Sequence, residues 1–348
     1  MQPLDDAGEP AIDRLPNLPG VFMLFPPEGE PYLGRTNLLR RRLLRLWRLL
    51  HPRHAVARVE YCLTGSKLEA SLRLYELARR FFPERYATML HLRMPPYIKL
   101  TLGNPFPRTH ITTQLGRSPA HYFGPFRSRL SAERFESQLL DLFQIRRCQD
   151  DLKPAPDHPG CMYGEMGMCL RPCQEVVGLE EYGSEVNRVK EFLVTGGRSL
   201  LDPVAAARER LSAEMQFEEA ARQHKRVEKI HDVLKLRDEM ARDIDCLNGI
   251  AVTASASPNS VELSFLHSGH WQGTRRIQFD QVSLDEKLRH AAGDLSETVL
   301  TARERQDYLA IVARWFYSSW RDGEFLIFDS FDNIPFRKLV RSISRVAS

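Results

Sequence analysis

The chain has 348 residues, of which 43% are hydrophobic and 27% charged, a composition that excludes a disordered protein and suits two or three globular domains. The net charge is only +4, so any affinity for nucleic acid must come from local clusters of basic residues. The N-terminal residues lack the basic start and apolar core of a signal peptide, and no apolar run approaches the roughly 18 residues of a membrane span. We therefore expect a cytoplasmic protein without membrane contact.

The pattern along residues 13–90 predicts a small α/β domain. The apolar run that follows Pro19 and Gly20, and the short run at residues 31–34, predict two strands joined by a turn. Residues 36–50 contain no Gly or Pro and mix Leu with Arg, which predicts a basic amphipathic helix starting near Thr36 or Asn37. A strand at residues 57–63 and a helix at residues 67–82, which Pro83 ends, complete the domain.

Residues 91–147 form a predicted connector. It contains the strand-like run Y-I-K-L-T-L, a loop H-Y-F-G-P-F-R-S and a helical run at residues 131–143. Residues 239–348 are expected to form a mixed α/β region, with strands over V-E-L-S-F-L, R-R-I-Q-F and residues 324–328, and helices near residues 285–292 and 300–318. The whole chain is thus predicted to be an α+β multidomain protein.

Four cysteines fall within a segment, residues 148–175, that is rich in Gly and Pro. A cytosolic chain keeps its thiols reduced, so this crowding indicates a metal rather than disulfides. Four thiolates suit tetrahedral zinc or an iron–sulfur cluster such as 4Fe-4S, and the absence of C-x-x-C pairs favours the cluster. Unligated buried cysteines are the alternative. The candidate ligands are Cys148, Cys161, Cys169 and Cys173.

Three further residues bear on this metal prediction. His158 lies in the same segment and is either a fifth candidate ligand or an exposed loop histidine. Cys62 and Cys246 lie far from the four in sequence, and we expect them to be small buried hydrophobic residues.

Residues 200–238 are predicted to be a pair of helices. Asp202 is a suitable N-cap for the first helix, with Pro203 at its first position. In the second helix, apolar residues and one histidine recur at spacings of three and four and mark one face. This face either docks on a partner or forms core for this chain alone. Its residues are Phe217, Ala220, Ala221, His224, Val227 and Ile230.

Several of these segments resemble one protein family. The runs Pro19-Gly20-Val21-Phe22 and Tyr32-Leu33-Gly34-Arg35, with Arg42, resemble the GIY-YIG nuclease module of UvrC, the incision subunit of bacterial nucleotide excision repair. The runs Y-I-K-L-T and Y-F-G-P-F and the cysteine spacing are similar to the UvrC segments that follow. E-M-Q-F-E-E-A-A-R at residues 214–222 resembles the UVR motif, a helical hairpin that docks on UvrB.

The order of these segments identifies the chain as resembling the N-terminal half of UvrC. The RNase H-like nuclease and helix-hairpin-helix domains that follow in UvrC are expected to be missing. In the family, tyrosines and basic residues surround the scissile phosphate while a glutamate holds one divalent metal, Mg²⁺ or Mn²⁺, for phosphodiester hydrolysis. The retained positions are Tyr32, Arg35 and Arg42.

Three positions depart from the family pattern. Phe22 replaces the first tyrosine, Leu74 the metal-binding glutamate and Tyr86 an asparagine. Leucine cannot hold a hard cation, which needs oxygen ligands. Glu76 should be rotated about 200° from position 74 on a helix, and Glu69 matches another family position. We therefore hypothesise that the module kept DNA affinity and lost hydrolysis, the alternative being an active nuclease with a relocated metal ligand.

A cluster of arginines without interleaved acids favours DNA-backbone binding over a merely solvated helix face. The DNA-binding candidates are Arg35, Arg40, Arg41, Arg42 and Arg45, with Arg48 in the same run. The resemblance implies DNA and UvrB as partners. The alternative functions are an interaction protein whose hairpin binds another partner outside repair, and a GIY-YIG endonuclease with a different nucleic-acid substrate.

Overall fold

The computed structural model of the chain describes residues 1–4, 9–50, 56, 58–116, 119–149, 152–279, 288 and 298–347. The chain divides into two compact units. The first holds Met1–Arg93, Asn248–Leu300 and Asp307–Ser348, and the second holds Met94–Leu247 and Thr301–Gln306. Within the described residues, no helix is both long and apolar enough to cross a membrane.

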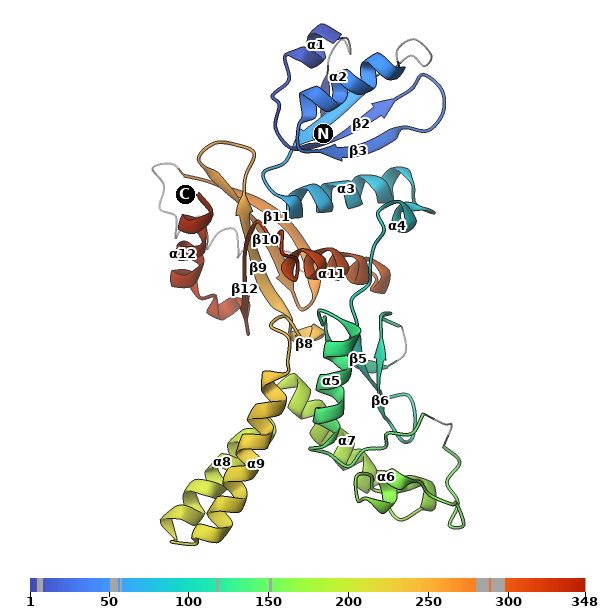
Figure 1. The fold of residues 1–348 in the computed structure, drawn as a ribbon, viewed down its shortest axis with the longest axis vertical. Helices are drawn as coiled ribbons and strands as arrows, with labels where there is room; N and C mark the ends of the chain where they lie inside the picture. The colour runs from blue at the N-terminus through green and yellow to red at the C-terminus, as the bar shows by residue number, and fades with distance from the viewer. Residues whose placement is uncertain are drawn as a thin grey trace. The chain divides into compact units, whose positions relative to one another are not determined.

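The first unit begins with a four-stranded antiparallel sheet and its helices (Figure 1). The strand order is β1(Gln2–Leu4), β4(Arg58–Leu63), β2(Gly20–Phe25) and β3(Tyr32–Thr36). The helices of this module are α1(Glu9–Asp13), α2(Leu39–Leu50), α3(Lys67–Phe81) and α4(Tyr86–Met89). The predicted strands and helices are present, although α2 begins two residues later than expected because the Thr36 hydroxyl accepts a hydrogen bond from the Leu38 amide and so forms a turn before it.

Strand β2 is the centre of this module because its apolar side chains are buried on both faces of the sheet. Phe22, on one face, packs with Leu39 and Leu43 of α2. Gly34 of β3 lies opposite Phe22, and a Cβ at this glycine would be 2.7 Å from Cζ of the phenylalanine. Only glycine therefore fits beneath that ring.

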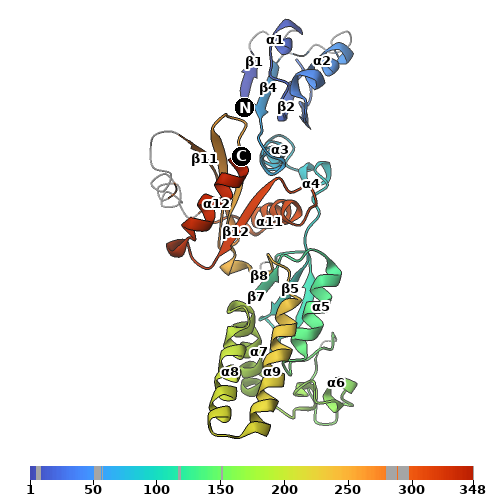
Figure 2. The same cartoon turned by 60° about the vertical axis from the view of Figure 1, so that its left-hand side comes forward.

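A second antiparallel sheet belongs to the same unit. Its strand order is β11(His270–Gln278), β10(Ser260–His267), β9(Asn248–Ala254) and β12(Gly323–Phe328). Leu339 and Ile343 of α12(Phe336–Ala347) pack into the core of this sheet, and α11(Ala302–Phe316) lies beside α3 in both views (Figures 1 and 2). The strands and the helix predicted at residues 300–318 are confirmed, whereas the helix expected at residues 285–292 lies outside the described residues except for Leu288.

The second unit combines a third antiparallel sheet with several helices. Its strand order is β6(Thr109–Thr112), β5(Tyr97–Thr101), β7(Ala120–Gly124) and β8(Arg242–Asp243). The helices are α5(Arg129–Leu140), α6(Met162–Glu165), α7(Leu179–Val194), α8(Arg198–Ala213) and α9(Phe217–Lys235). Single-turn 3-10 helices occur in the chain at Pro172–Gln174, Ile244–Cys246 and Phe331–Asn333.

Two features of the second unit differ from the sequence predictions. The segment expected to be the loop H-Y-F-G-P-F-R-S contains β7, because its first residues pair with β5 before the Gly124-Pro125 step ends the strand. Helix α7 has no counterpart among the sequence predictions. Its buried side chains recur at spacings of four and three, which is the signal that could have found it: Tyr182, Val186, Val189 and Phe192.

The start of α8 also corrects a prediction. The helix begins at Arg198 after an N-cap at Gly197, so Asp202 is not the N-cap and Pro203 lies inside the helix. Gly197 adopts a φ of 96°, a conformation that favours glycine, and this allows α8 to start immediately after α7. Starting early lets Leu200 and Leu201 pack on the core of the unit, which offsets the backbone hydrogen bond that Pro203 cannot make.

In the first unit, a buried carboxylate connects α11 to α3 and α4. Asp307 of α11 is fully buried and accepts hydrogen bonds from the hydroxyls of Tyr75 in α3 (3.2 Å) and Tyr86 in α4 (2.6 Å). The rings of Tyr75 and Tyr308 meet edge to face at 4.9 Å, and Tyr308 stacks on Trp271. Burial, and next the charge of Asp307, raise the pKa of Tyr75, so this hydroxyl remains a donor.

We expect Asp307→Ala to lower the free energy of unfolding by about 3 kcal/mol, because two buried hydroxyls lose their acceptor. Tyr86→Phe, which removes one donor and its hydrogen bond, should cost about half as much. The measurement is denaturant unfolding followed by circular dichroism. The matched control is Asp329→Ala, at an exposed aspartate. Equal stability of the Asp307→Ala and Asp329→Ala variants would show that the buried carboxylate does not hold these helices together.

Candidate functional site

The retained positions of the nuclease-like module lie on two faces of strand β3. Arg42 of α2 donates from Nη2 to the Tyr32 hydroxyl at 3.5 Å, so these two side chains meet on the α2 side. Arg35, three residues further along β3, donates from Nη1 to Oγ of Ser71 in α3 at 3.3 Å. Because side chains alternate along a strand, Tyr32 and Arg35 are directed to opposite faces. The structure brings Tyr32 and Arg42 together and places Arg35 beside α3.

The three departures from the family pattern have structural roles. Phe22 is completely buried and packs against Tyr32 with ring centres 6.0 Å apart. Tyr86 is buried and donates to Asp307. Leu74 is half-buried and lines a cavity of about 260 Å³ together with Arg35. Among the described residues, the lining of this cavity contains no carboxylate.

Neither neighbouring glutamate reaches that cavity. Glu76 forms an ion pair with Arg73 at 3.1 Å and lines a different hollow. Glu69 is buried at the first turn of α3, where its backbone amide donates to the Ser66 hydroxyl at 3.0 Å. No relocated acid therefore replaces Leu74 among the residues that the structure describes around Arg35.

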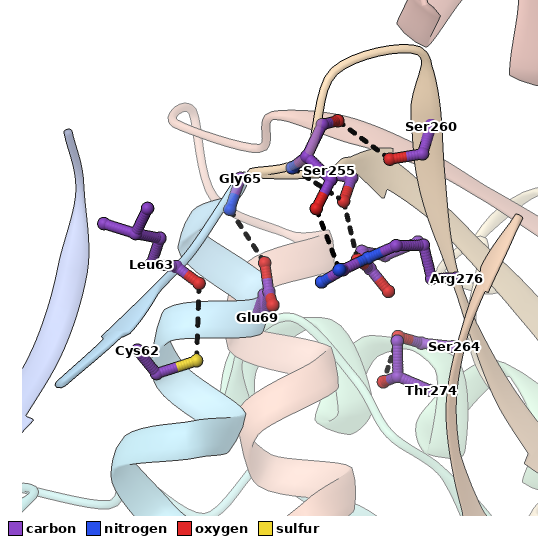
Figure 3. A network of polar contacts seen from close by, with 11 residues as sticks. Cys62, Leu63, Gly65, Glu69, Ser255, Ser260, Ser264, Thr274 and Arg276 are labelled. Atoms are coloured by element: carbon purple, nitrogen blue, oxygen red, sulfur yellow. Dashed lines mark hydrogen bonds and ion pairs between the residues drawn. The ribbon is translucent and has the colours of Figure 1, made fainter. Parts of the chain in front are cut away.

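Glu69 lies near a polar network of the second sheet in this unit, whose charged residues Glu262 and Arg276 act on it electrostatically (Figure 3). Its carboxylate accepts from the Gly65 amide at 2.7 Å. Across the network, Arg276 donates from Nε to Glu262 at 2.6 Å, and the Ser255 hydroxyl donates to the same glutamate oxygen at 2.7 Å. Burial raises the pKa of Glu69, the Gly65 amide opposes this, and the charge of Glu262 adds to the increase. Glu69 is thus a buried structural residue, whereas a metal-binding carboxylate needs open, polar surroundings.

The basic face of α2 is the second candidate surface. Leu39 and Leu43 are buried, whereas Arg41, Arg45 and Arg48 recur at spacings of four and three and are exposed on the outer side. They line a hollow of about 590 Å³ with Arg40, whose Nη1 donates to the Asp13 carbonyl at 3.4 Å. Helix α2 contains no acidic residue, so its own sequence contributes only positive charge to this face.

The four cysteines come together around short turns. Cys161 is the N-cap of α6, Cys173 lies in the 3-10 helix Pro172–Gln174, and Cys148 is 3.8 Å from Nη1 of the buried Arg146. The pKa of the Cys169 thiol is raised to about 11, mainly by burial; a backbone hydrogen bond at Arg171 opposes the increase, and the charges of Cys148, Cys161 and Cys173 contribute to it. The four thiols are therefore electrostatic neighbours that cannot all ionise without a compensating cation.

The spacing of the sulfurs bears on the choice of metal. Among the described residues, one group of three potential metal ligands has its ligand atoms within 4.8 Å of one another, namely His121, Asp243 and Asp245. No three of the cysteine sulfurs lie that close together. A tetrahedral zinc with Zn–S bonds of about 2.3 Å would draw four sulfurs to about 3.8 Å from one another. A donor set of four thiols fits a metal group of either kind.

The acidic cluster of the second unit has no counterpart among the sequence predictions. His121 Nδ1 lies 3.2 Å from an oxygen of Asp243, and Arg305 lies 2.8 Å from Asp245. All three side chains therefore already have a partner in these contacts. Burial raises the pKa of Asp243. His121 lies far in sequence from Asp243 and Asp245, so no sequence pattern marks the three residues together.

The remaining cysteine and histidine predictions have mixed outcomes. Cys246 is exposed, so its prediction as a buried hydrophobic residue is wrong, because the 3-10 helix that it ends turns its side chain outward. Cys62 is half-buried and donates to the Leu63 carbonyl at 3.4 Å. His158 is half-buried rather than exposed, and its Nδ1 accepts from the Gly160 amide at 3.0 Å.

The helical pair α8 and α9 divides the predicted docking residues into two sets. Ala220, Val227 and Ile230 are buried. Phe217, at the tip, has 66% of its surface exposed, and Ala221 and His224 follow it at spacings of four and then three and are also exposed. Met215, in the turn before α9, has a φ of 59° and is 75% exposed. One row of α9 side chains is thus buried, and a second row is exposed to solvent.

The chain is similar in sequence to known proteins over most of its length. Residues 95–192, from the start of β5 to near the end of α7, match the family model "UvrC/Cho excinuclease, middle domain". The "UvrABC system protein C" of Moorella thermoacetica is 32% identical over 249 residues, which cover 69% of this chain and 40% of that protein. The chain belongs to the UvrC family.

Other members of the UvrC family match more of the chain at lower identity. The "UvrABC system protein C" of Lachnospira eligens is 26% identical over 86% of this chain and 49% of that protein. For Proteus mirabilis the identity is 27% over 81% of this chain and 48% of the relative. The chain thus spans about half the length of the curated relatives that it matches. No solved structure matches the chain.

Sequence reasoning missed three residues around the cavity beside Arg35. Arg93 follows α4, while Arg314 of α11 and Trp320 come from the other end of the chain. No motif connects these positions, and only the packing of α11 beside α3 brings them to the same cavity.

Proposed function

We propose that this UvrC-family chain is a nucleotide excision repair factor that binds DNA through α2 and docks on UvrB through the tip of the α8–α9 hairpin. The observation that carries the proposal is the presence, on one chain of this family, of an arginine-rich helix without acidic residues and of an exposed row that begins at Phe217. Phosphate contacts from arginine supply sequence-independent DNA affinity. An exposed aromatic residue on a helix is a suitable anchor for a partner helix.

The nuclease-like module binds DNA without hydrolysing it in this proposal. Hydrolysis in the family requires a divalent metal, and Leu74 supplies no oxygen at the position of its ligand. The cavity beside Leu74 contains arginines and no carboxylate in its described lining. Tyr32 and Arg42 remain in contact and can still hold a phosphate oxygen.

The chain should bind damaged duplex DNA and leave it unnicked in Mg²⁺ or Mn²⁺. Arg41→Ala combined with Arg45→Ala should weaken binding about tenfold. It should also reduce the slope of log K against log salt concentration by roughly 0.9 for each phosphate that the variant no longer neutralises. Fluorescence anisotropy measures binding, and a denaturing gel detects nicks. The control with the same charge change is Arg337→Ala combined with Arg341→Ala on α12. Metal-dependent nicking that stops on Tyr32→Phe would instead establish an active nuclease.

Phe217→Ala should weaken binding to UvrB about 30-fold, as expected for a central aromatic anchor. Surface plasmon resonance with immobilised UvrB measures this, with and without damaged DNA. Leu130→Ala, at an equally apolar side chain that is 55% exposed on α5, serves as the control. An unchanged affinity of the Phe217→Ala variant would remove UvrB docking from the proposal and favour the second candidate, an interaction protein with a different partner.

The cysteine segment holds an iron–sulfur cluster in this proposal, with Cys148, Cys161, Cys169 and Cys173 as ligands. Two observations support a cluster over zinc: the sequence has no C-x-x-C pairs, and no three of the described cysteine sulfurs lie within 4.8 Å of one another. Bound there, the cluster would crosslink the turns that carry the cysteines, because each ligand lies on a different short segment.

Anaerobically purified protein should be brown, with an absorbance band near roughly 400 nm. Cys169→Ser should remove most of the colour and lower the melting temperature, since the cluster binds only the folded segment. Cys246→Ser, at an exposed cysteine outside the segment, is the control and should keep both. Colourless protein with one zinc ion per chain by mass spectrometry would replace the cluster with zinc.

A further inference from the structure

Two adjoining hollows of the first unit share the side chains of Arg35 and Trp320. The smaller, about 260 Å³, is also lined by Leu74, Arg93 and Arg314. The larger, about 770 Å³, is also lined by Lys67 and Asp322. We refer to the two hollows together as the arginine groove. Its walls come from β3, α3, the segment after α4, and α11 with the turn that follows it.

The arginine groove carries a strong positive charge. Arg35, Arg93 and Arg314 are exposed, and the side chains of Arg93 and Arg314 form no ion pair with any described residue. Arg35 donates one hydrogen bond, to the neutral Ser71 hydroxyl. These guanidinium groups therefore retain most of their donors for a ligand.

Asp322 is the one acidic residue in the described lining, and both of its oxygens are already used. One accepts from the Lys67 amide at 2.6 Å, and the other accepts from Nε1 of Trp315 at 2.9 Å. The carboxylate thus orders the wall of the groove. It stands beside Lys67, whose ammonium adds another positive charge to the groove.

Trp320 gives the groove an aromatic surface. Its side chain is 36% exposed, whereas Trp271 and Trp315 are buried. The Lys67 ammonium lies 5.6 Å from the centre of the Trp320 ring and donates to the Trp320 carbonyl at 3.4 Å. An exposed indole among cations is the combination that binds unpaired nucleotides, because the ring stacks on a base while the cations hold the phosphates. In a duplex the bases are stacked on one another, so their faces are not accessible to this ring.

We propose that the arginine groove binds single-stranded nucleic acid, with phosphates on Arg35, Arg93 and Arg314 and a base stacked on Trp320. The proposal extends the DNA binding proposed above, which places duplex DNA on α2. Leu74 has a direct role in it. A glutamate at position 74 would pair with the arginines of the cavity, whereas leucine leaves them available for phosphate without a metal.

The test uses the full chain and a fluorescein-labelled oligothymidylate of about 12 nucleotides, a length within the range of known single-strand sites. Binding should quench the tryptophan emission of the protein. Arg93→Ala and Arg314→Ala should each weaken binding about tenfold and lower the salt slope by roughly 0.7. Trp320→Ala should weaken binding at least about tenfold, and Trp320→Phe should restore part of the affinity without the quenching. Arg337→Ala, on α12, is the matched control.

Three results would overturn the proposal. The first is binding that the Arg93, Arg314 and Trp320 variants leave unchanged, and the second is full quenching in the Trp320→Phe protein. The third is the same variant dependence for polyglutamate with no binding of oligothymidylate, which would assign the groove to acidic peptides. If Arg314→Ala fails to fold, Arg314→Lys keeps the charge but loses the bidentate fork and should bind less tightly. Duplex binding by α2 is measured separately with Arg41→Ala, so the two proposals can fail independently.

Discussion

The carboxylate of Asp307 is completely buried and accepts hydrogen bonds from Tyr75 and Tyr86, and this interaction sets the position of α11 beside α3 and α4. A buried charge is costly unless hydrogen bonds compensate it, so the three residues are held in one arrangement. The aromatic contacts of Tyr75 with Tyr308, and of Tyr308 with Trp271, surround the carboxylate with rigid groups. Arg314 lies two turns further along the same helix and lines the cavity of Arg35 and Leu74.

The leucine at position 74 limits the chemistry that the cavity beside Arg35 can perform. A carboxylate there would hold a divalent cation, and the cation would carry the charge that develops during hydrolysis. With leucine, the same phosphates can be neutralised only by arginine, which binds them but generates no nucleophile. The hydroxyl of Tyr86 donates to the buried Asp307 and so has a structural role.

Helix α9 of the α8–α9 hairpin has a buried row and an exposed row of side chains. Ala220 and Val227 are buried, while Phe217, Ala221 and His224 remain accessible on another side of α9. Leaving a phenylalanine two-thirds exposed costs hydrophobic free energy, which binding to a complementary surface would recover. This exposure is the reason for proposing that the tip docks on a partner.

Local patterns are sufficient for most helices and strands, since hydrophobic periodicity and turn residues act within a few positions: α3, α11, the helical pair and the β10–β11 hairpin follow from them. They fail where distant packing overrides a local preference, at Pro203 inside α8 and at the β7 strand, and α7 is absent from the predictions although its periodicity is regular. The sequence by itself also determined the basic charge of α2, the crowding of four cysteines and the leucine at position 74. Only the tertiary structure decided that Tyr32 meets Arg42, that Ala220 is buried, and that Arg35 shares a groove with Arg314 and Trp320, because burial and contacts between remote segments depend on how the whole chain packs.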